Sequence, residues 1–144
     1  MKKLFLSFIF FIFSFSAFCQ NKNIIIQFYF CKEDTQQVST LAKDFYTTLK
    51  ETQPFNEYAK KIKIGGQINT IKVSLDNYDE LVYNQQELIK NHAQANAVDI
   101  YIINTKRTIA KGGTIKNIPV IFADHNIDTQ TLLHELCHAL VGLG

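Results

Sequence analysis

The chain has 144 residues, of which 47% are hydrophobic and 19% charged, with 15 Lys and Arg against 13 Asp and Glu. This length allows one domain or part of one, because domains usually contain about 100–150 residues. The share of charged residues excludes a disordered polyelectrolyte, and the mean hydropathy of −0.03 excludes a protein with many membrane spans.

Residues 1–19 have the pattern of a secretory signal peptide. Two lysines precede an almost unbroken apolar stretch, 4–15, and Ala17 and Cys19 are small residues where such a cleavage site needs them. The apolar stretch is short for a membrane-spanning helix, which needs about 20 residues. We therefore expect a secreted or periplasmic protein, with no stable membrane insertion after cleavage. A retained anchor and lipidation at Cys19 are the weaker alternatives.

Residues 20–144 predict a single, formally neutral domain. Removal of residues 1–19 takes away two lysines and no acidic residue, which leaves 13 basic and 13 acidic side chains. No basic stripe remains, so we expect no nucleic-acid partner. Two cysteines remain, Cys31 and Cys137, and the sequence leaves open whether they form a disulfide.

The first predicted elements are a strand and a helix. Asn23–Phe30 (NIIIQFYF) is dense in β-branched and aromatic residues, which is typical of a buried strand. Glu33–Lys50 has apolar residues at helical spacing, and Asp34 is placed to cap the start of this helix. The helical pattern breaks at Pro54.

A turn, a second strand and a second helix are predicted next. Within Lys61–Ile68, the pair Gly65-Gly66 indicates a turn between isoleucines. Residues 70–75 alternate in polarity and predict a strand, and residues 77–92 carry an apolar stripe that predicts a helix.

The last part of the chain predicts two strands, an edge element and a final helix. The strands are 98–103 and 118–122, and the short, irregular edge element is 107–114. The helix is Thr129–Val141, with Asp128 as its N-cap. Strands that alternate with helices predict an α/β fold, with a mixed, mostly parallel sheet and helices packed on it.

The final helix contains His134-Glu135-Leu136-Cys137-His138, an HExxH motif. Four residues advance a helix by about 400°, so His134 and His138 stack on one face, one turn apart. Two imidazoles so placed can bind one Zn²⁺ at about 2.0–2.1 Å. Glu135 is expected at the rim of that face, where it can take a proton from zinc-activated water.

The residues around the motif are apolar, which predicts a buried helix whose histidines need an explanation. Metal ligation explains them. The alternative is that His134 and His138 are core histidines bonded to the backbone and that Glu135 is an exposed helix former.

With this motif and this order of elements, the chain resembles zinc metallopeptidases of the zincin group, most closely the N-terminal half of a metzincin. The resemblance covers residues 23–144 and implies a zincin-like fold that ends in the active-site helix. It implies peptide-bond hydrolysis, with Zn²⁺ held by His134 and His138 and with Glu135 as general base. It also implies a peptide or protein substrate that pairs with the edge element near Gly112-Gly113.

The chain departs from the metzincin pattern HExxHxxGxxH after its second histidine. Val141 stands where the glycine is expected, Gly142 comes one place late, and neither a third histidine nor a Met-turn follows. We therefore expect residues 20–144 to be one zincin-like catalytic domain of an exported zinc metallopeptidase, intact or truncated. The alternative is a catalytically inactive exported binding module with the same fold.

Three upstream residues and one residue of the motif are the remaining candidates for a third zinc ligand. His125 and Asp124 lie in the predicted loop before the last helix. His92 lies in or after a predicted helix, and Cys137 lies within the motif. The competing interpretations are a loop histidine for His125, a solvated side chain for His92 and a small buried hydrophobe for Cys137.

Overall fold

The computed structural model describes residues 23–30, 34–68, 96–103 and 107–141. The predicted signal peptide, Cys31, His92, the predicted strand 70–75 and the predicted helix 77–92 lie outside these ranges.

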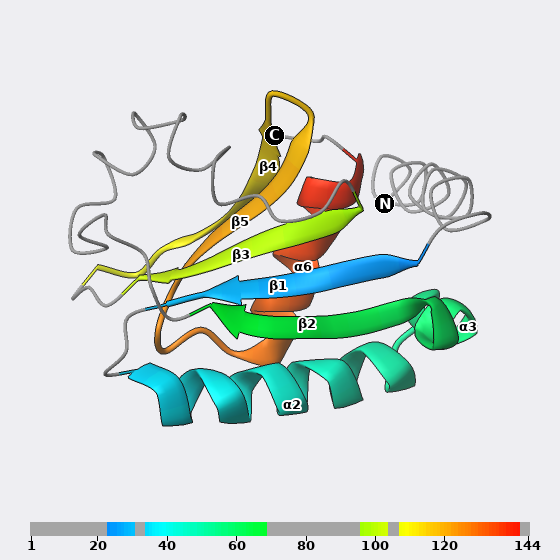
Figure 1. The fold of residues 1–144 in the computed structure, drawn as a ribbon, viewed down its shortest axis with the longest axis horizontal. Helices are drawn as coiled ribbons and strands as arrows, with labels where there is room; N and C mark the ends of the chain where they lie inside the picture. The colour runs from blue at the N-terminus through cyan, green and yellow to red at the C-terminus, as the bar shows by residue number, and fades with distance from the viewer. Residues whose placement is uncertain (1–22, 31–33, 69–95, 104–106, 142–144) are drawn as a thin grey trace, which may run out of the picture.

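The described residues form an α/β fold around a five-stranded mixed sheet (Figure 1). Its strands follow the order β2-β1-β3-β5-β4, and their bounds are β1 Ile24–Tyr29, β2 Ile62–Ile68, β3 Ala97–Ile103, β4 Ala110–Ile115 and β5 Ile118–Asp124. β1 pairs in parallel with β2 and β3, β3 pairs in parallel with β5, and β4 runs antiparallel to β5 at the edge. The prediction of a mixed, mostly parallel sheet is confirmed.

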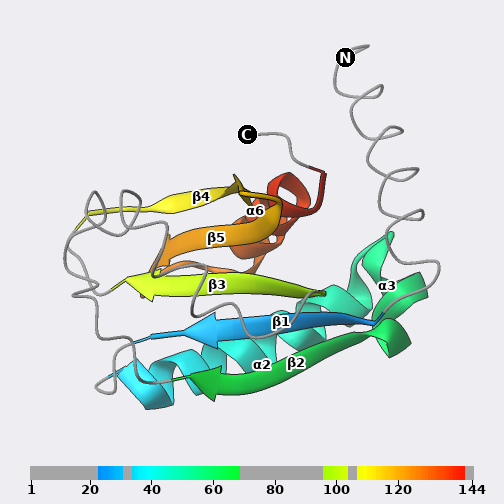
Figure 2. The same ribbon diagram turned by 45° about the horizontal axis from the view of Figure 1, so that its top comes forward.

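Two long helices, α2 (Thr35–Glu51) and α6 (Thr129–Val141), cover the same face of the sheet (Figures 1 and 2). The short helix α3 (Phe55–Tyr58) and the 3₁₀ turn η2 (Ala59–Lys61) lead from α2 into β2. The predicted final helix is confirmed at the same bounds. The helix expected over Glu33–Lys50 begins at Thr35, and Asp34 takes the N-cap position without a capping hydrogen bond from its side chain.

A single hydrophobic core lies between the sheet and the two long helices. Every second residue of the central strand β3 enters it, as do apolar residues spaced three or four apart on the helices. Its fully or nearly fully buried members include, from β3, Val98, Ile100 and Ile102, from α2, Val38, Ala42, Phe45 and Leu49, and from α6, Leu132, Leu133, Leu136 and Ala139.

The opposite face of the sheet carries a row of stacked aromatic rings. Tyr29 pairs in register with Tyr101, and Tyr101 pairs with Phe122. The ring centroids are 4.7 Å apart in the first pair and 5.6 Å apart in the second. Burial raises the pKa of the Tyr101 hydroxyl well above its usual value, because the phenolate would lose its hydration.

The turn predicted at Gly65-Gly66 is wrong, because both glycines lie inside β2. Ile26 pairs with Ile64, whereas Phe28 pairs with Gln67, so the two glycines face a single residue of β1 in a β-bulge. A Cβ on Gly65 would lie within 2.9 Å of the Gln27 and Ile25 side chains. Gly65 therefore serves close strand packing rather than chain reversal.

The predicted edge element is the strand β4, joined to β5 by a two-residue turn that the sequence did not reveal. Lys116 and Asn117 form this turn with φ values of 48° and 67°. Positive φ at both positions is typical of a type I′ hairpin turn, which is more often Asn-Gly. The turn fixes the register between β4 and β5.

Candidate functional site

The helix α6 holds the HExxH motif, and its first turn is fixed by Asp128. The Asp128 carboxylate accepts hydrogen bonds from the backbone N–H groups of Gln130 and Thr131, both at 2.9 Å, and from the Thr131 hydroxyl at 2.7 Å. The Thr131 hydrogen bonds lower the pKa of Asp128, because they favour the charged form. The predicted N-cap is thus confirmed, and it sets the position at which the helix begins.

His134 and His138 lie side by side on the outer flank of α6. Leu133, Leu136 and Ala139 are buried against the sheet, whereas His134 is exposed and His138 is half-buried. The two imidazoles point toward each other, with 3.0 Å between their Nε2 atoms, 4.6 Å between ring centroids and 81° between ring planes. The interpretation as a core histidine does not fit His134, because that residue is exposed.

The spacing of the two nitrogens suits a shared metal ion. Two Nε2 atoms bound to one tetrahedral Zn²⁺ at about 2.0–2.1 Å lie about 3.3 Å apart. The observed 3.0 Å differs from this separation by only a few tenths of an ångström. This separation is therefore compatible with His134 and His138 as two neighbouring ligands of zinc.

The Glu135 carboxylate is buried and hydrogen-bonded rather than free in solvent. The side chain is 8% exposed, and its Oε2 accepts a buried hydrogen bond of 2.6 Å from the backbone N–H of Gly112 in β4. The carboxylate is therefore anchored between α6 and the edge strand rather than free at the rim of the histidine face. The alternative of an exposed helix former is wrong for the same reason.

The backbones of α6 and β4 approach each other closely at Gly112. A Cβ at this position would collide with the backbone carbonyl oxygen of Glu135, whereas a Cβ on the neighbouring Gly113 would meet nothing within 4 Å. Sequence reasoning placed both glycines in the edge element but missed this contact with the motif. The available signal was a glycine inside a strand, which indicates close approach of another backbone.

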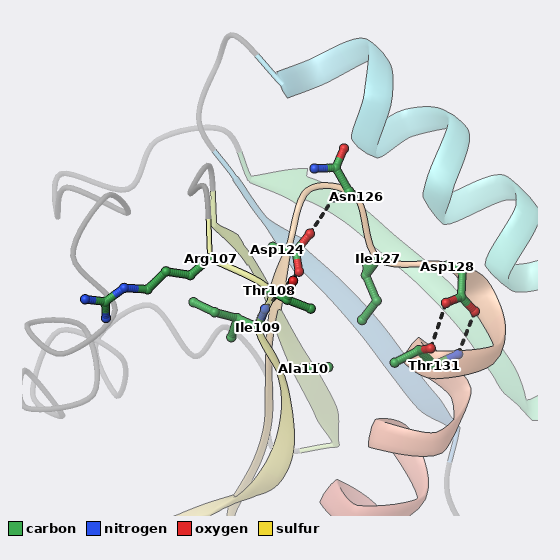
Figure 3. Close-up of a pocket in the computed structure, with 9 residues that line it drawn as sticks. All are labelled: Arg107, Thr108, Ile109, Ala110, Asp124, Asn126, Ile127, Asp128 and Thr131. Carbon is green, nitrogen blue, oxygen red and sulfur yellow. Dashed lines mark hydrogen bonds between the residues drawn. The ribbon is translucent and has the colours of Figure 1, made fainter.

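Among the described residues, the candidate ligands Asp124 and His125 do not join the two histidines. Asp124 accepts hydrogen bonds from the backbone N–H groups of Ile109 and Asn126, both at 2.9 Å (Figure 3). The backbone carbonyl of His125 accepts a hydrogen bond from the Gln37 side chain. Within the described residues, no group of three His, Cys, Asp or Glu side chains is placed to hold a metal ion.

The Cys137 side chain is half-buried. It is not in a disulfide, and burial raises the pKa of its thiol to about 12. Zinc binds cysteine as the thiolate, which a raised pKa disfavours. This residue therefore fits a half-buried packing position better than the ligand role considered for it.

A small cavity of about 280 Å³ lies at the N-terminal end of α6, between that helix, β4 and the loop after β5 (Figure 3). Thr131 lines it one helical turn before Glu135, and Ala110 lines it two residues before Gly112. The cavity therefore borders the same two elements, α6 and β4, that meet at Glu135 and Gly112. Sequence reasoning did not identify it, because its walls come from three separate elements.

In the part of the chain that the structure describes, no helix has the length and apolar content needed to span a bilayer.

Comparisons of the chain with protein families, with curated proteins and with solved structures found no match.

Proposed function

We propose that this chain is an exported zinc-dependent peptidase in which His134 and His138 hold Zn²⁺ and Glu135 is the general base. The observation that carries the proposal is the convergence of the two Nε2 atoms, 3.0 Å apart, on the outer flank of α6. This arrangement leaves solvent access on the side where a substrate would approach, because His134 is exposed.

Each residue has one task in this proposal. Zn²⁺ bound here would supply a Lewis acid that acidifies water and polarises a carbonyl group. The imidazoles of His134 and His138 would fix its position through their Nε2 atoms. The carboxylate of Glu135 would take a proton during attack on the scissile bond and return it to the leaving amine.

The order of elements also supports a zincin-like fold. A strand, a helix, further strands, an edge strand and a last strand precede the helix that carries the motif, as expected from the resemblance. β4 is the last strand of the sheet, so one of its edges has no strand partner within the described residues. An extended peptide substrate would add a strand at the outward backbone groups of this edge other than the Gly112 N–H, which Glu135 already occupies.

The test measures zinc content and peptide cleavage on the same purified chain. We expect about one zinc per chain, as for a single site with imidazole ligands, and loss of that zinc in His134→Ala and in His138→Ala. His125→Ala is the matched control and should keep the metal. Glu135→Gln should keep the zinc and lose cleavage of a mixed peptide library. Absence of zinc from the wild-type chain after incubation with the metal would overturn the proposal.

A catalytically inactive binding module is the second candidate, and the buried hydrogen bond of Glu135 favours it. A carboxylate that joins α6 to β4 through Gly112 already has a structural role. This candidate predicts that no peptide is cleaved, with or without zinc, and that Glu135→Gln changes only stability. Cleavage that depends on Glu135 would eliminate it.

A further inference from the structure

The backbone N–H of Gly112 points toward the free edge of the sheet. Asp124 donates its backbone N–H to the carbonyl of Ile109 at 2.9 Å, which shows that the backbone groups of Ile109 face β5. In an antiparallel pair, this orientation repeats at every second residue. The backbone groups of Ala110, Gly112 and Thr114 therefore face away from β5. Thr114 pairs with Pro119, which has no N–H, in agreement with this alternation.

The carboxylate of Glu135 accepts a hydrogen bond from this outward N–H. The Gly112 N–H donates to Oε2 at 2.6 Å, in a hydrogen bond buried from solvent. A hydrogen bond to a buried carboxylate is short and strong, and it restricts the rotation of the side chain. Any side chain larger than hydrogen at position 112 would push the strand away from Glu135, because the added Cβ would collide with that residue's carbonyl oxygen.

We propose that Gly112 is a positioning residue for Glu135. Its N–H fixes Oε2, and Oε1 is then the oxygen that takes the proton. Glycine is required at this position because only a residue without a Cβ lets β4 approach α6 closely enough for the hydrogen bond. This inference rests on the proposed function for its catalytic meaning, whereas the hydrogen bond itself can be tested without any activity.

Amide hydrogen exchange in the metal-free chain tests the hydrogen bond. The Gly112 N–H should exchange at least about tenfold more slowly than the N–H of Thr114, which also faces the free edge. In Glu135→Leu, a variant that keeps bulk but cannot accept a hydrogen bond, the Gly112 N–H should exchange as fast as that of Thr114. Equal rates at the two positions in the wild-type chain, or slow exchange that survives Glu135→Leu, would overturn the proposal.

Kinetics test the positioning role at Gly112, and the neighbouring Gly113 provides a steric control. We expect Gly112→Ala to keep its zinc and lower kcat by at least about tenfold with little change in KM, as a misplaced catalytic group does. Gly113→Ala, which adds a methyl group to open space, is the steric control and should keep the stability and zinc content of the wild type.

The two sets of measurements separate the two proposals. If the wild type cleaves peptides and Gly112→Ala retains its kcat, the positioning role is wrong and the proposed function stands. If the wild type binds no zinc and cleaves nothing, the proposed function fails, and the catalytic part of this inference fails with it. If Gly112→Ala does not fold, the exchange comparison between wild type and Glu135→Leu decides.

Discussion

Removal of the Asp128 carboxylate should loosen the start of the helix that carries the HExxH motif. Asp128→Ala deletes three hydrogen bonds, two to backbone N–H groups and one to the Thr131 hydroxyl. Water replaces part of them because Asp128 is exposed, so the expected loss is about 1 kcal/mol, within the range of roughly 0.5–2 kcal/mol for N-caps. Asp128→Asn keeps a side-chain oxygen that can accept hydrogen bonds, so it should lower the free energy of unfolding much less.

Urea unfolding at neutral pH measures this loss. With a slope of about 2 kcal/mol per M, a loss of about 1 kcal/mol moves the midpoint down by about 0.5 M. Asp44→Ala, which removes an exposed carboxylate in the interior of α2, is the matched control and should move the midpoint little. Equal midpoints for wild type, Asp128→Ala and Asp128→Asn would refute the capping role.

The same pair of proteins has a defined pH dependence. Hydrogen bonds from Thr131 lower the pKa of Asp128 in the folded chain. The capping contribution is therefore complete above the pKa of an unfolded aspartate, about 3.9, and is lost as the pH falls through the lower folded value. The difference in stability between wild type and Asp128→Ala should shrink as the pH is lowered from 5 to 3. A difference that grows in acid would contradict this assignment.

Two further predictions concern the hydrophobic core under α6 and the aromatic row on the opposite face of the sheet. Leu136→Ala should lower the free energy of unfolding, measured with urea, by about 2–5 kcal/mol, because Leu136 is 1% exposed in the core under the motif. Leu41→Ala, at a half-buried position, should lower it less. Tyr101→Phe should stabilise the chain by about 1 kcal/mol in the same assay, because the buried Tyr101 hydroxyl has no hydrogen-bond partner within the described residues. A loss of stability in Tyr101→Phe would show that this hydroxyl has a partner after all.

The sequence predicted those elements whose pattern is strong and local. The strands at 23–30, 98–103 and 118–122 appear as β1, β3 and β5, and α6 begins and ends where its cap and apolar spacing indicated. The prediction at Gly65-Gly66 failed because a glycine pair signals either a turn or a close approach of strands. Only the pairing of β2 with β1 distinguishes the two.

The candidate site, too, has one part that local sequence predicts and one part that it does not. The helical repeat alone places His134 and His138 one turn apart, and the structure brings their Nε2 atoms to 3.0 Å. The position of Glu135 depends on what lies beside α6, and no local pattern contains that information. Its hydrogen bond to Gly112 joins residues 23 positions apart in the sequence.

By itself, the sequence determined that His134 and His138 lie one helical turn apart, because a helix fixes the relation between residues four apart. Tertiary structure decided which side of α6 is buried, how the carboxylate between the two histidines is anchored, and that β4 closes the sheet as an antiparallel edge strand. These features follow from packing between elements that are distant in the chain. The surroundings of a side chain there consist of residues that its neighbours in sequence do not specify.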